Sequence, residues 1–206
     1  SSLIETIPVQ IIDPEVHNLV SGGPERRRQY VDWVTFHVEH GYLSLWRKYK
    51  RILKQRNSAL KSKSKRSLVQ SWDKDFIELA GRIDTARKKA LDLIMVNFKS
   101  LGKKIIGLDF SFNYHEGWSS KKDLKKALDD TFERDIFLGA TQNGPHRADL
   151  KIDLSNKQAR KLVSRGQQKL LASAMILAAT KSVQNTLDKP LLLLLDDPAA
   201  ELDLES

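Results

Sequence analysis

Leu191–Asp197 reads Leu-Leu-Leu-Leu-Leu-Asp-Asp, and this stretch decides which class of fold the chain adopts. The leucine run is far shorter than the roughly 20 apolar residues that a transmembrane helix needs. An unbroken apolar run of this length is typical of a strand buried on both faces of a parallel sheet. The two carboxylates follow at the carboxyl end of that strand, where open α/β sheets place their ligands. The stretch therefore suits a site for a metal-bound phosphate.

A helix start precedes this strand. Ser164-Arg165-Gly166-Gln167 opens a mostly apolar segment that continues to Ala179, and Ser164 stands in the position of an N-cap. The first turn of a helix favours an anion, and a glycine without a Cβ lets a phosphate come close. Alone, the tetrapeptide could be an ordinary helix cap. Alone, the leucine run could be a buried strand that ends in turn-forming acids.

In combination, these motifs resemble those of the RecF family of ABC-type and SMC-like DNA repair ATPases. Ser164–Gln167 resembles the ABC signature, and Leu191–Asp197 with Glu201-Leu202-Asp203 resembles a Walker B strand and the D-loop behind it. The features specific to this family are Arg directly after the signature Ser, Asp-Asp in place of Asp-Glu, and the closing Glu-Leu-Asp. Other similar segments are Pro14-Glu15, Gly23–Arg28 and Gly144–Asp149.

The resemblance implies a role for each residue at the nucleotide. Asp196 would hold Mg²⁺, and Asp197 would polarise the attacking water. Because Asp is one methylene shorter than the usual Glu, we expect slow ATP hydrolysis. Gln10 stands about where ABC-type ATPases carry a glutamine that contacts metal and water, although such a residue is more often the polar face of a strand. The remaining candidate ATP-binding residues are Ser164, Arg165, Gly166 and Gln167, which would reach the γ-phosphate held by the opposite subunit, and Glu201 and Asp203.

A phosphate-binding P-loop is absent from the sequence. The nearest candidate, Gly102-Lys103-Lys104, lacks a Gly five residues before Gly102 and a Ser or Thr after Lys103. The family carries its P-loop upstream of the region that this chain matches. We therefore expect the chain to be a section of a longer protein that is an ATPase as a whole, and we expect the section alone to be inactive.

The overall composition indicates in which cellular compartment the protein works. The 206 residues include no cysteine, so neither a disulfide nor a Cys-based zinc site can form, which agrees with a reducing cytoplasm. No secretory signal pattern opens the chain, and no apolar run approaches transmembrane length. We expect a soluble, cytoplasmic protein without a membrane partner.

The net charge of +9 is concentrated in one part of the chain. Between Leu43 and Lys104 there are 18 Lys or Arg and 5 Asp or Glu, a balance of +13, so the remainder carries −4. Such a surface can displace the counterions of nucleic-acid phosphates. A solvated helix face would have the same composition. The resemblance to a DNA repair family favours DNA.

The expected fold class is mixed α/β, an ABC-type ATPase head interrupted by an antiparallel helical arm. Residues 1–40 are expected to form a head segment that begins with a strand before Asp13. Residues 41–104 are expected to form the arm: a helix with apolar positions up to Leu60, an exposed hairpin tip at Lys61–Ser67, and a second helix from about Val69 to Leu101. Residues 105–206 return to the head, with a strand near Lys103–Tyr114 and another over Thr141–Leu154.

Two clusters of cations are candidate DNA contacts. The first lies in the expected hairpin tip and consists of Lys61, Lys63, Lys65 and Arg66. The second follows Pro24 at an expected helix start and consists of Arg26, Arg27 and Arg28. Because the N-terminal end of a helix disfavours cations, the second cluster indicates an outside anion, either DNA or an acidic partner, unless carboxylates of the chain itself pair with it.

His146 and Arg147 belong to a Gly-Pro-His-Arg turn that precedes the signature segment. They could contact nucleotide or DNA. Equally, Gly-Pro could hold a turn whose two polar side chains are exposed. The sequence does not separate these two interpretations.

The family resemblance implies an ATP-dependent, DNA-binding homodimer that acts at gaps and single-strand/double-strand junctions and, with RecO and RecR, helps to load RecA. Two alternatives stay open. The chain could be a DNA-binding adaptor whose signature and Walker B motifs no longer act. It could also belong to another SMC-like ATPase, such as an overcoming-lysogenization-defect-type nuclease, although no cluster of nuclease carboxylates supports this.

Overall fold

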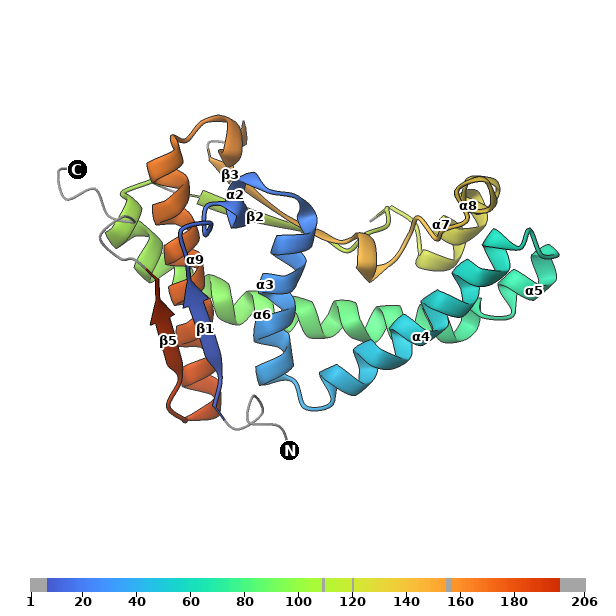
Figure 1. The fold of residues 1–206 in the computed structure, drawn as a ribbon, viewed down its shortest axis with the longest axis horizontal. Helices are drawn as coiled ribbons and strands as arrows, with labels where there is room; N and C mark the ends of the chain where they lie inside the picture. Colours follow the sequence, from blue (N-terminus) through green and yellow to red (C-terminus); the bar gives the residue numbers. More distant parts are fainter. Residues whose placement is uncertain (1–6, 109, 120, 155–156, 197–206) are drawn as a thin grey trace. The chain divides into compact units, whose positions relative to one another are not determined.

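The computed structural model describes residues 7–108, 110–119, 121–154 and 157–196, which fall into two compact units (Figure 1). Among the described residues, unit 1 consists of those within 7–40, 88–113 and 150–196, and unit 2 of those within 41–87 and 114–149. This division differs from the expected one. Residues 88–104 group with the head segment rather than with the arm, and residues 114–149 group with the arm rather than with the head.

Unit 1 contains the strand pair that the sequence predicts. Strand β1, Val9–Ile12, pairs in parallel with β5, Leu192–Leu195, with Gln10 opposite Leu193 and Ile12 opposite Leu195. The carboxyl ends of the two strands therefore lie at the same edge. This position after the strand, expected for Asp196 from the leucine run, is confirmed by the backbone N–H of Asp196, which donates to the carbonyl of Ile12 at 2.9 Å.

The expectation that the leucine strand is buried on both faces is wrong in this structure. Leu192, Leu194 and Leu195 are 48%, 43% and 56% exposed. Among the described residues the sheet has two strands, and helix α9, Arg165–Leu187, lies against β1 on one side only. Burial of both faces would need further strands and a second covering layer.

Helix α9 forms the centre of unit 1 because its small and apolar side chains point to several neighbours at once. Residues of α9 that are buried are Leu171, Ala172, Ala174, Met175, Ile176, Ala178, Ala179 and Val183. Helices α2, Asn18–Ser21, and α3, Pro24–Val38, pack against it. The hydroxyl of Tyr30 donates to the carbonyl of Met175 at 2.9 Å, which fixes α3 on α9. A helix that is apolar around most of its surface is stable only in such a buried place.

A second sheet of three strands has the order β2-β3-β4. Strand β2, Phe110–His115, alternates between half-buried and exposed side chains, as its sequence pattern predicts. Strand β3, Asp149–Leu154, pairs in antiparallel fashion with β4, Lys157–Gln158. The strand expected over Thr141–Leu154 thus begins only at Asp149, because Pro145–Arg147 forms a turn of 3-10 helix, η1. A second such turn, η2, covers Ala159–Lys161.

Unit 2 is built from helices. Its elements are α4, Tyr42–Lys61; α5, Arg66–Gln70; the first part of α6, Asp73–Ile106; α7, Leu124–Asp130; and α8, Phe132–Leu138. The first arm helix is confirmed. The second arm helix differs from the prediction, because the short helix α5 precedes it and α6 begins at Asp73. None of the helices in the described ranges is both long and apolar enough to cross a bilayer.

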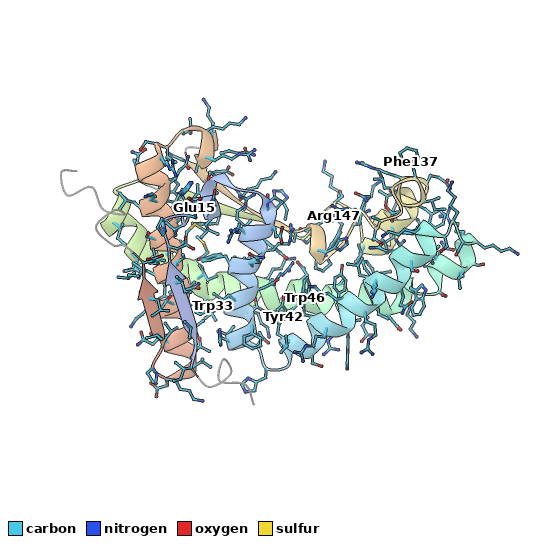
Figure 2. The ribbon with its side chains drawn as sticks, viewed as in Figure 1. Glu15, Trp33, Tyr42, Trp46, Phe137 and Arg147 are labelled. Atoms are coloured by element: carbon cyan, nitrogen blue, oxygen red, sulfur yellow. The ribbon has the colours of Figure 1, made fainter. Side chains whose placement is uncertain are left out.

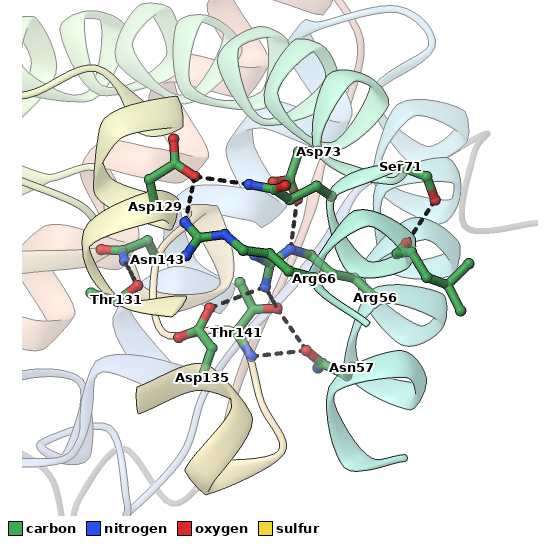
Figure 3. Close-up of polar contacts among 12 residues, drawn as sticks. Arg56, Asn57, Arg66, Ser71, Asp73, Asp129, Thr131, Asp135, Thr141 and Asn143 are labelled. Carbon is green, nitrogen blue, oxygen red and sulfur yellow. Dashed lines mark hydrogen bonds and ion pairs between the residues drawn. The ribbon is translucent and has the colours of Figure 1, made fainter. Parts of the chain in front are cut away.

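A buried polar network holds α8 and the following loop against α4 and α6 (Figure 3). The guanidinium of Arg56, which is completely buried, contacts Asp73 at 2.9 Å, Asp135 at 3.0 Å and the Thr141 hydroxyl at 2.8 Å. Asn57 accepts both the backbone N–H of Thr141, at 2.8 Å, and its hydroxyl, at 2.7 Å. These contacts join residues that are up to 85 positions apart in the chain.

The Gly-Pro-His-Arg turn is fixed inside unit 2. The Tyr49 hydroxyl lies 2.6 Å from Nδ1 of His146, and Nε2 of His146 lies 2.9 Å from the Thr141 carbonyl oxygen. Because a carbonyl only accepts, Nε2 must carry a proton and donate. Both ring nitrogens are therefore used within the unit, and neither of the two interpretations left open for His146 describes its position. Arg147 is exposed and donates to Gln142 at 3.2 Å (Figure 2).

Candidate functional site

The polar edge of the β1–β5 pair is the first candidate site. Asp196 is exposed directly after β5, and Asp13 is exposed directly after β1. The parallel pairing brings both positions to one edge. Asp13 carries the same signal in the sequence as Asp196, a carboxylate immediately after a strand, and a role could have been predicted for it on that basis. The Asp13 carboxylate also accepts the backbone N–H of Glu15 at 2.9 Å, which turns the chain toward α2.

A cavity of about 250 Å³ opens beside this edge. Its polar lining includes Gln10, Asp13, Glu15, Asn18, Arg26 and Gln29, and its apolar lining includes Leu19, Tyr30, Trp33 and Ile176. The indole N–H of Trp33 donates to the carbonyl of Val9 at 3.1 Å and so fixes one wall (Figure 2). The predicted nucleotide residue Gln10 and the predicted DNA residue Arg26 thus line the same cavity.

The Ser164–Gln167 segment begins α9 with a capping box. The Ser164 hydroxyl oxygen accepts the backbone N–H of Gln167 at 3.3 Å, and the Gln167 side chain accepts the backbone N–H of Ser164 at 2.9 Å. All four residues of the segment are exposed. The place where a Cβ of Gly166 would lie is open, with nothing beyond its own helix and chain neighbours within 4 Å. The segment therefore offers an open surface on which the backbone N–H groups of Arg165 and Gly166 have no partner within the helix.

The capping segment and the strand edge are far apart within unit 1. Strand β5 returns alongside α9 after a short turn (Figure 1). A helix of 23 residues is about 34 Å long at 1.5 Å per residue, whereas the chain advances only about 16 Å from Leu191 to Asp196. Ser164 therefore lies roughly 15–20 Å beyond Asp196 along their shared direction. One phosphate group cannot contact both in a single chain.

The strand edge fits a Mg²⁺ ion that a nucleotide brings with it. Mg²⁺ prefers oxygen ligands, keeps several waters, and usually takes one or two carboxylates together with substrate phosphates. Asp196 supplies one exposed carboxylate for this purpose. Within the described ranges there is no group of three His, Cys, Asp or Glu that could hold a metal without such help. The predicted residues Asp197, Glu201 and Asp203 lie outside the described residues.

The three arginines near the start of α3 have different surroundings. Arg26 is exposed. Arg27 is only 7% exposed, and its guanidinium donates to the carbonyl of Gly22 at 2.7 Å, so it holds the turn before α3. Arg28 is half-buried and makes contacts within the chain. The cluster that the sequence suggests as one DNA-contact surface is therefore reduced to Arg26 on the exposed side.

The four tip cations also separate. Lys61, Lys63 and Lys65 are exposed between α4 and α5. The Arg66 guanidinium instead lies over the ring of Phe132, 4.4 Å from its centroid, and forms an ion pair with Asp129 at 3.2 Å (Figure 3). Arg66 thus fixes α5 to α7 and α8. Arg66 is also exposed, at 48%, but these contacts engage it in the fold, whereas the three lysines make no ion pair among the described residues.

Sequence reasoning missed a second group of lysines in unit 2. Lys121, Lys125 and Lys126 are exposed at the start of α7. These lysines lie about sixty positions after the tip, in a segment that was expected to belong to the head. Asp and Glu residues of the same segment lower its net charge, so a count of charges along the sequence does not reveal the lysines. The contacts of Asp129 with Arg66 and Gln70 show that α7 lies beside α5.

Comparison with known proteins identifies similar chains. No family model matches the sequence. Along all 206 residues the chain is 36% identical to the DNA replication and repair protein RecF of Shewanella frigidimarina (strain NCIMB 400) and 37% identical to that of Shewanella piezotolerans (strain WP3 / JCM 13877). The chain spans 57% of the length of each of these relatives.

Solved structures of RecF are also similar to this chain. One is described as the recombination mediator protein RecF-ATP in the RecFOR pathway; it matches with a TM-score of 0.88 and 26% identity over 96% of this chain and 57% of its own. A second, described as RecF-ATPrS in the same pathway, has a TM-score of 0.87 and 27% identity. The expected mixed α/β fold class is confirmed by these similarities.

Proposed function

We infer that this chain, which belongs to the RecF family of DNA replication and repair proteins, contributes half of a composite ATP site to a homodimer that binds DNA. The similar solved structure is described as RecF-ATP in the RecFOR pathway. By analogy, we propose that ATP with Mg²⁺ is the cofactor and that RecO and RecR are the partners with which the complete protein promotes RecA loading at DNA gaps.

The proposal of a composite site rests on the distance between the capping segment and the strand edge. Asp196 and the neighbouring Asp197 would act on the ATP bound to their own subunit, Asp196 through Mg²⁺ and Asp197 through the attacking water. Ser164, Arg165 and Gly166 lie too far along α9 to reach the same phosphate. They can serve ATP only when a second chain presents them, which makes ATP binding and dimer formation one event.

Phosphoryl transfer fits this arrangement because it needs little covalent help. It needs charge neutralisation, an oriented water and exclusion of bulk water. The chain supplies oxygen ligands at the strand edge and backbone N–H donors at the start of α9. When bound, the metal ion would neutralise charge that develops on the phosphate oxygens. The phosphate cradle would come from a P-loop outside these 206 residues.

Mixing two inactive variants tests the composite site. In the complete protein, Ser164→Arg and Asp197→Asn should each abolish ATP hydrolysis when present alone. In a mixed dimer both lesions fall on one site and leave the other intact, so random pairing should restore roughly a quarter of wild-type activity. Failure to recover activity after verified subunit exchange would contradict action in trans. Normal hydrolysis by Asp197→Asn alone would refute the role of Asp197.

A further inference from the structure

Three acidic side chains around the tip of unit 2, those of Asp123, Asp129 and Asp130, are already engaged in contacts. Asp129 accepts from Arg66 at 3.2 Å and from Gln70 at 3.1 Å. Asp130 pairs with Lys122, whose ammonium holds the pKa of that carboxyl below its usual value. Asp123 accepts the backbone N–H of Lys126 at 2.7 Å and caps α7. These acids are therefore used to build the fold.

The lysines of the same region are left over. Within the described ranges, no ion pair involves the three tip lysines Lys61, Lys63 and Lys65, nor the three lysines at the start of α7, Lys121, Lys125 and Lys126. All six are exposed. Residues 61–66 and 121–134 together carry nine Lys or Arg and four Asp or Glu, a balance of +5.

The two lysine groups belong to one face of unit 2. Asp129 contacts Arg66, which directly follows Lys65. Lys125 precedes Asp129 by one helical turn, and residues four apart on a helix have Cβ atoms about 6 Å apart. The other end of the tip is tied down as well, because the side chain of Lys61 lies against Gly139, just after α8. Figure 1 shows α7 and α8 beside α5 and the end of α4.

We propose that the start of α7, through Lys125 and Lys126, forms with the three tip lysines one continuous surface that binds the phosphate backbone of duplex DNA. The proposal rests on the DNA-binding function inferred above and adds the surface that performs it. Duplex DNA presents one charge per about 1.7 Å of its axis, so a surface of spaced cations faces several phosphates at once. Such contacts position the protein without reading sequence.

The residue type favours DNA over an acidic protein. Protein interfaces are depleted of lysine and enriched in arginine and aromatic residues. Among the described residues of the ranges 61–66 and 121–134, the cations without an ion pair are six lysines and one arginine, Arg134, whereas Arg66 lies over Phe132 and is engaged in the fold. Lysine is an effective point-charge partner for phosphate.

The test neutralises two lysines in the complete protein at saturating ATP. Lys125→Gln with Lys126→Gln removes two charges from α7, and Lys181→Gln with Lys189→Gln removes two exposed charges from unit 1 as the matched control. Affinity for a labelled random-sequence duplex is measured by fluorescence anisotropy from 0.1 to 1 M salt. The α7 variant should lose about 1.8 from the slope of log K against log salt, which is on the order of 50-fold in affinity at 0.1 M salt. The control should match the wild type.

The outcomes separate this surface from the function itself. If the wild type and the α7 variant bind DNA with the same affinity and slope, the surface is only solvated and the proposal is overturned while DNA binding stands. If instead binding of poly-glutamate falls and DNA binding does not, the surface fits an acidic protein and the proposal is again overturned. If the wild type binds no duplex, the proposed function fails as well. An unchanged thermal unfolding midpoint and ATPase rate confirm that the variant is folded.

Discussion

Arg56 and Asp135 form an ion pair in which Nη1 and Oδ2 are 3.0 Å apart and both side chains are completely buried. Transfer of two charges out of water is costly, and the pair repays that cost only when other hydrogen bonds complete it. Here Asp73 and Thr141 contact the same guanidinium, and the backbone N–H of Gln142 donates to Asp135 at 3.1 Å. The packing of α8 against α4 therefore depends on this pair.

Removal of one partner should be more damaging than removal of both. Asp135→Asn leaves the Arg56 charge buried with less compensation, so we expect a loss of about 3–5 kcal/mol in the free energy of unfolding by urea. The double variant Arg56→Met with Asp135→Leu should recover a large part of this loss. Equal or greater destabilisation of the double variant would show that the pair contributes net stability.

The same carboxyl predicts a pH effect. Burial raises the pKa of Asp135, and the contacts with Arg56 only partly oppose this. The unfolded chain therefore releases this proton at a lower pH, about 4, than the folded chain does. Stability contributed by the bound proton is present below pH 4 and is lost as pH rises through the folded pKa. The unfolding free energy of the wild type minus that of Asp135→Asn should thus fall with pH across that window. A rising difference would mean that Arg56 dominates.

Two glycines should respond oppositely to alanine. Gly117 has a φ of 99°, and a Cβ there would lie 2.1 Å from the carbonyl oxygen of Gly144. Because strain and overpacking each cost about 1–3 kcal/mol, Gly117→Ala should destabilise by at least 2 kcal/mol. Gly81 lies exposed in α6 with open space around its Cβ position. Gly81→Ala should stabilise by about 0.8–1 kcal/mol. Thermal unfolding of both variants measures the two effects.

Capping and ATP contact by Ser164 can be separated. Asp is as good an N-cap as Ser, so Ser164→Asp should leave the unfolding midpoint unchanged, whereas Ser164→Ala should cost about 1 kcal/mol. The carboxylate would repel a γ-phosphate, so Ser164→Asp should lose ATP-dependent dimerisation, followed by light scattering. If this variant still forms dimers with the normal dependence on ATP, Ser164 does not contact the γ-phosphate.

The tip cations should divide by role. Replacement of Lys61, Lys63 and Lys65 by Gln should weaken DNA binding similarly for all sequences and flatten its salt dependence, with little change in stability. Arg66→Gln should instead lower the unfolding midpoint, because it removes the contacts with Asp129 and Phe132. If Arg66→Gln weakens DNA binding without lowering the unfolding midpoint, Arg66 belongs to the DNA-binding surface after all.

Local patterns predicted the elements, and non-local contacts decided their surroundings. The leucine run and the Ser164 cap specify β5 and the start of α9, because strand length and capping depend on neighbouring residues. No local signal shows that Arg27 is buried or that Arg56 meets Asp135, 79 positions away. The candidate nucleotide-binding residues were predicted from local sequence motifs. The exposure of the leucines and the position of the α7 lysines could not be predicted in this way, because they depend on which distant segments of the chain pack beside them.

The open face of the leucine strand affects how these 206 residues behave in a test tube. Leu192–Leu195 is an uncharged, proline-free strand at the edge of a two-stranded sheet in the part of the chain that the structure describes. An exposed apolar edge of this kind is a template for strand addition by another copy. A preparation of these residues by themselves would therefore tend to self-associate and precipitate, and a negative charge introduced at Leu194, 43% exposed, should improve its solubility.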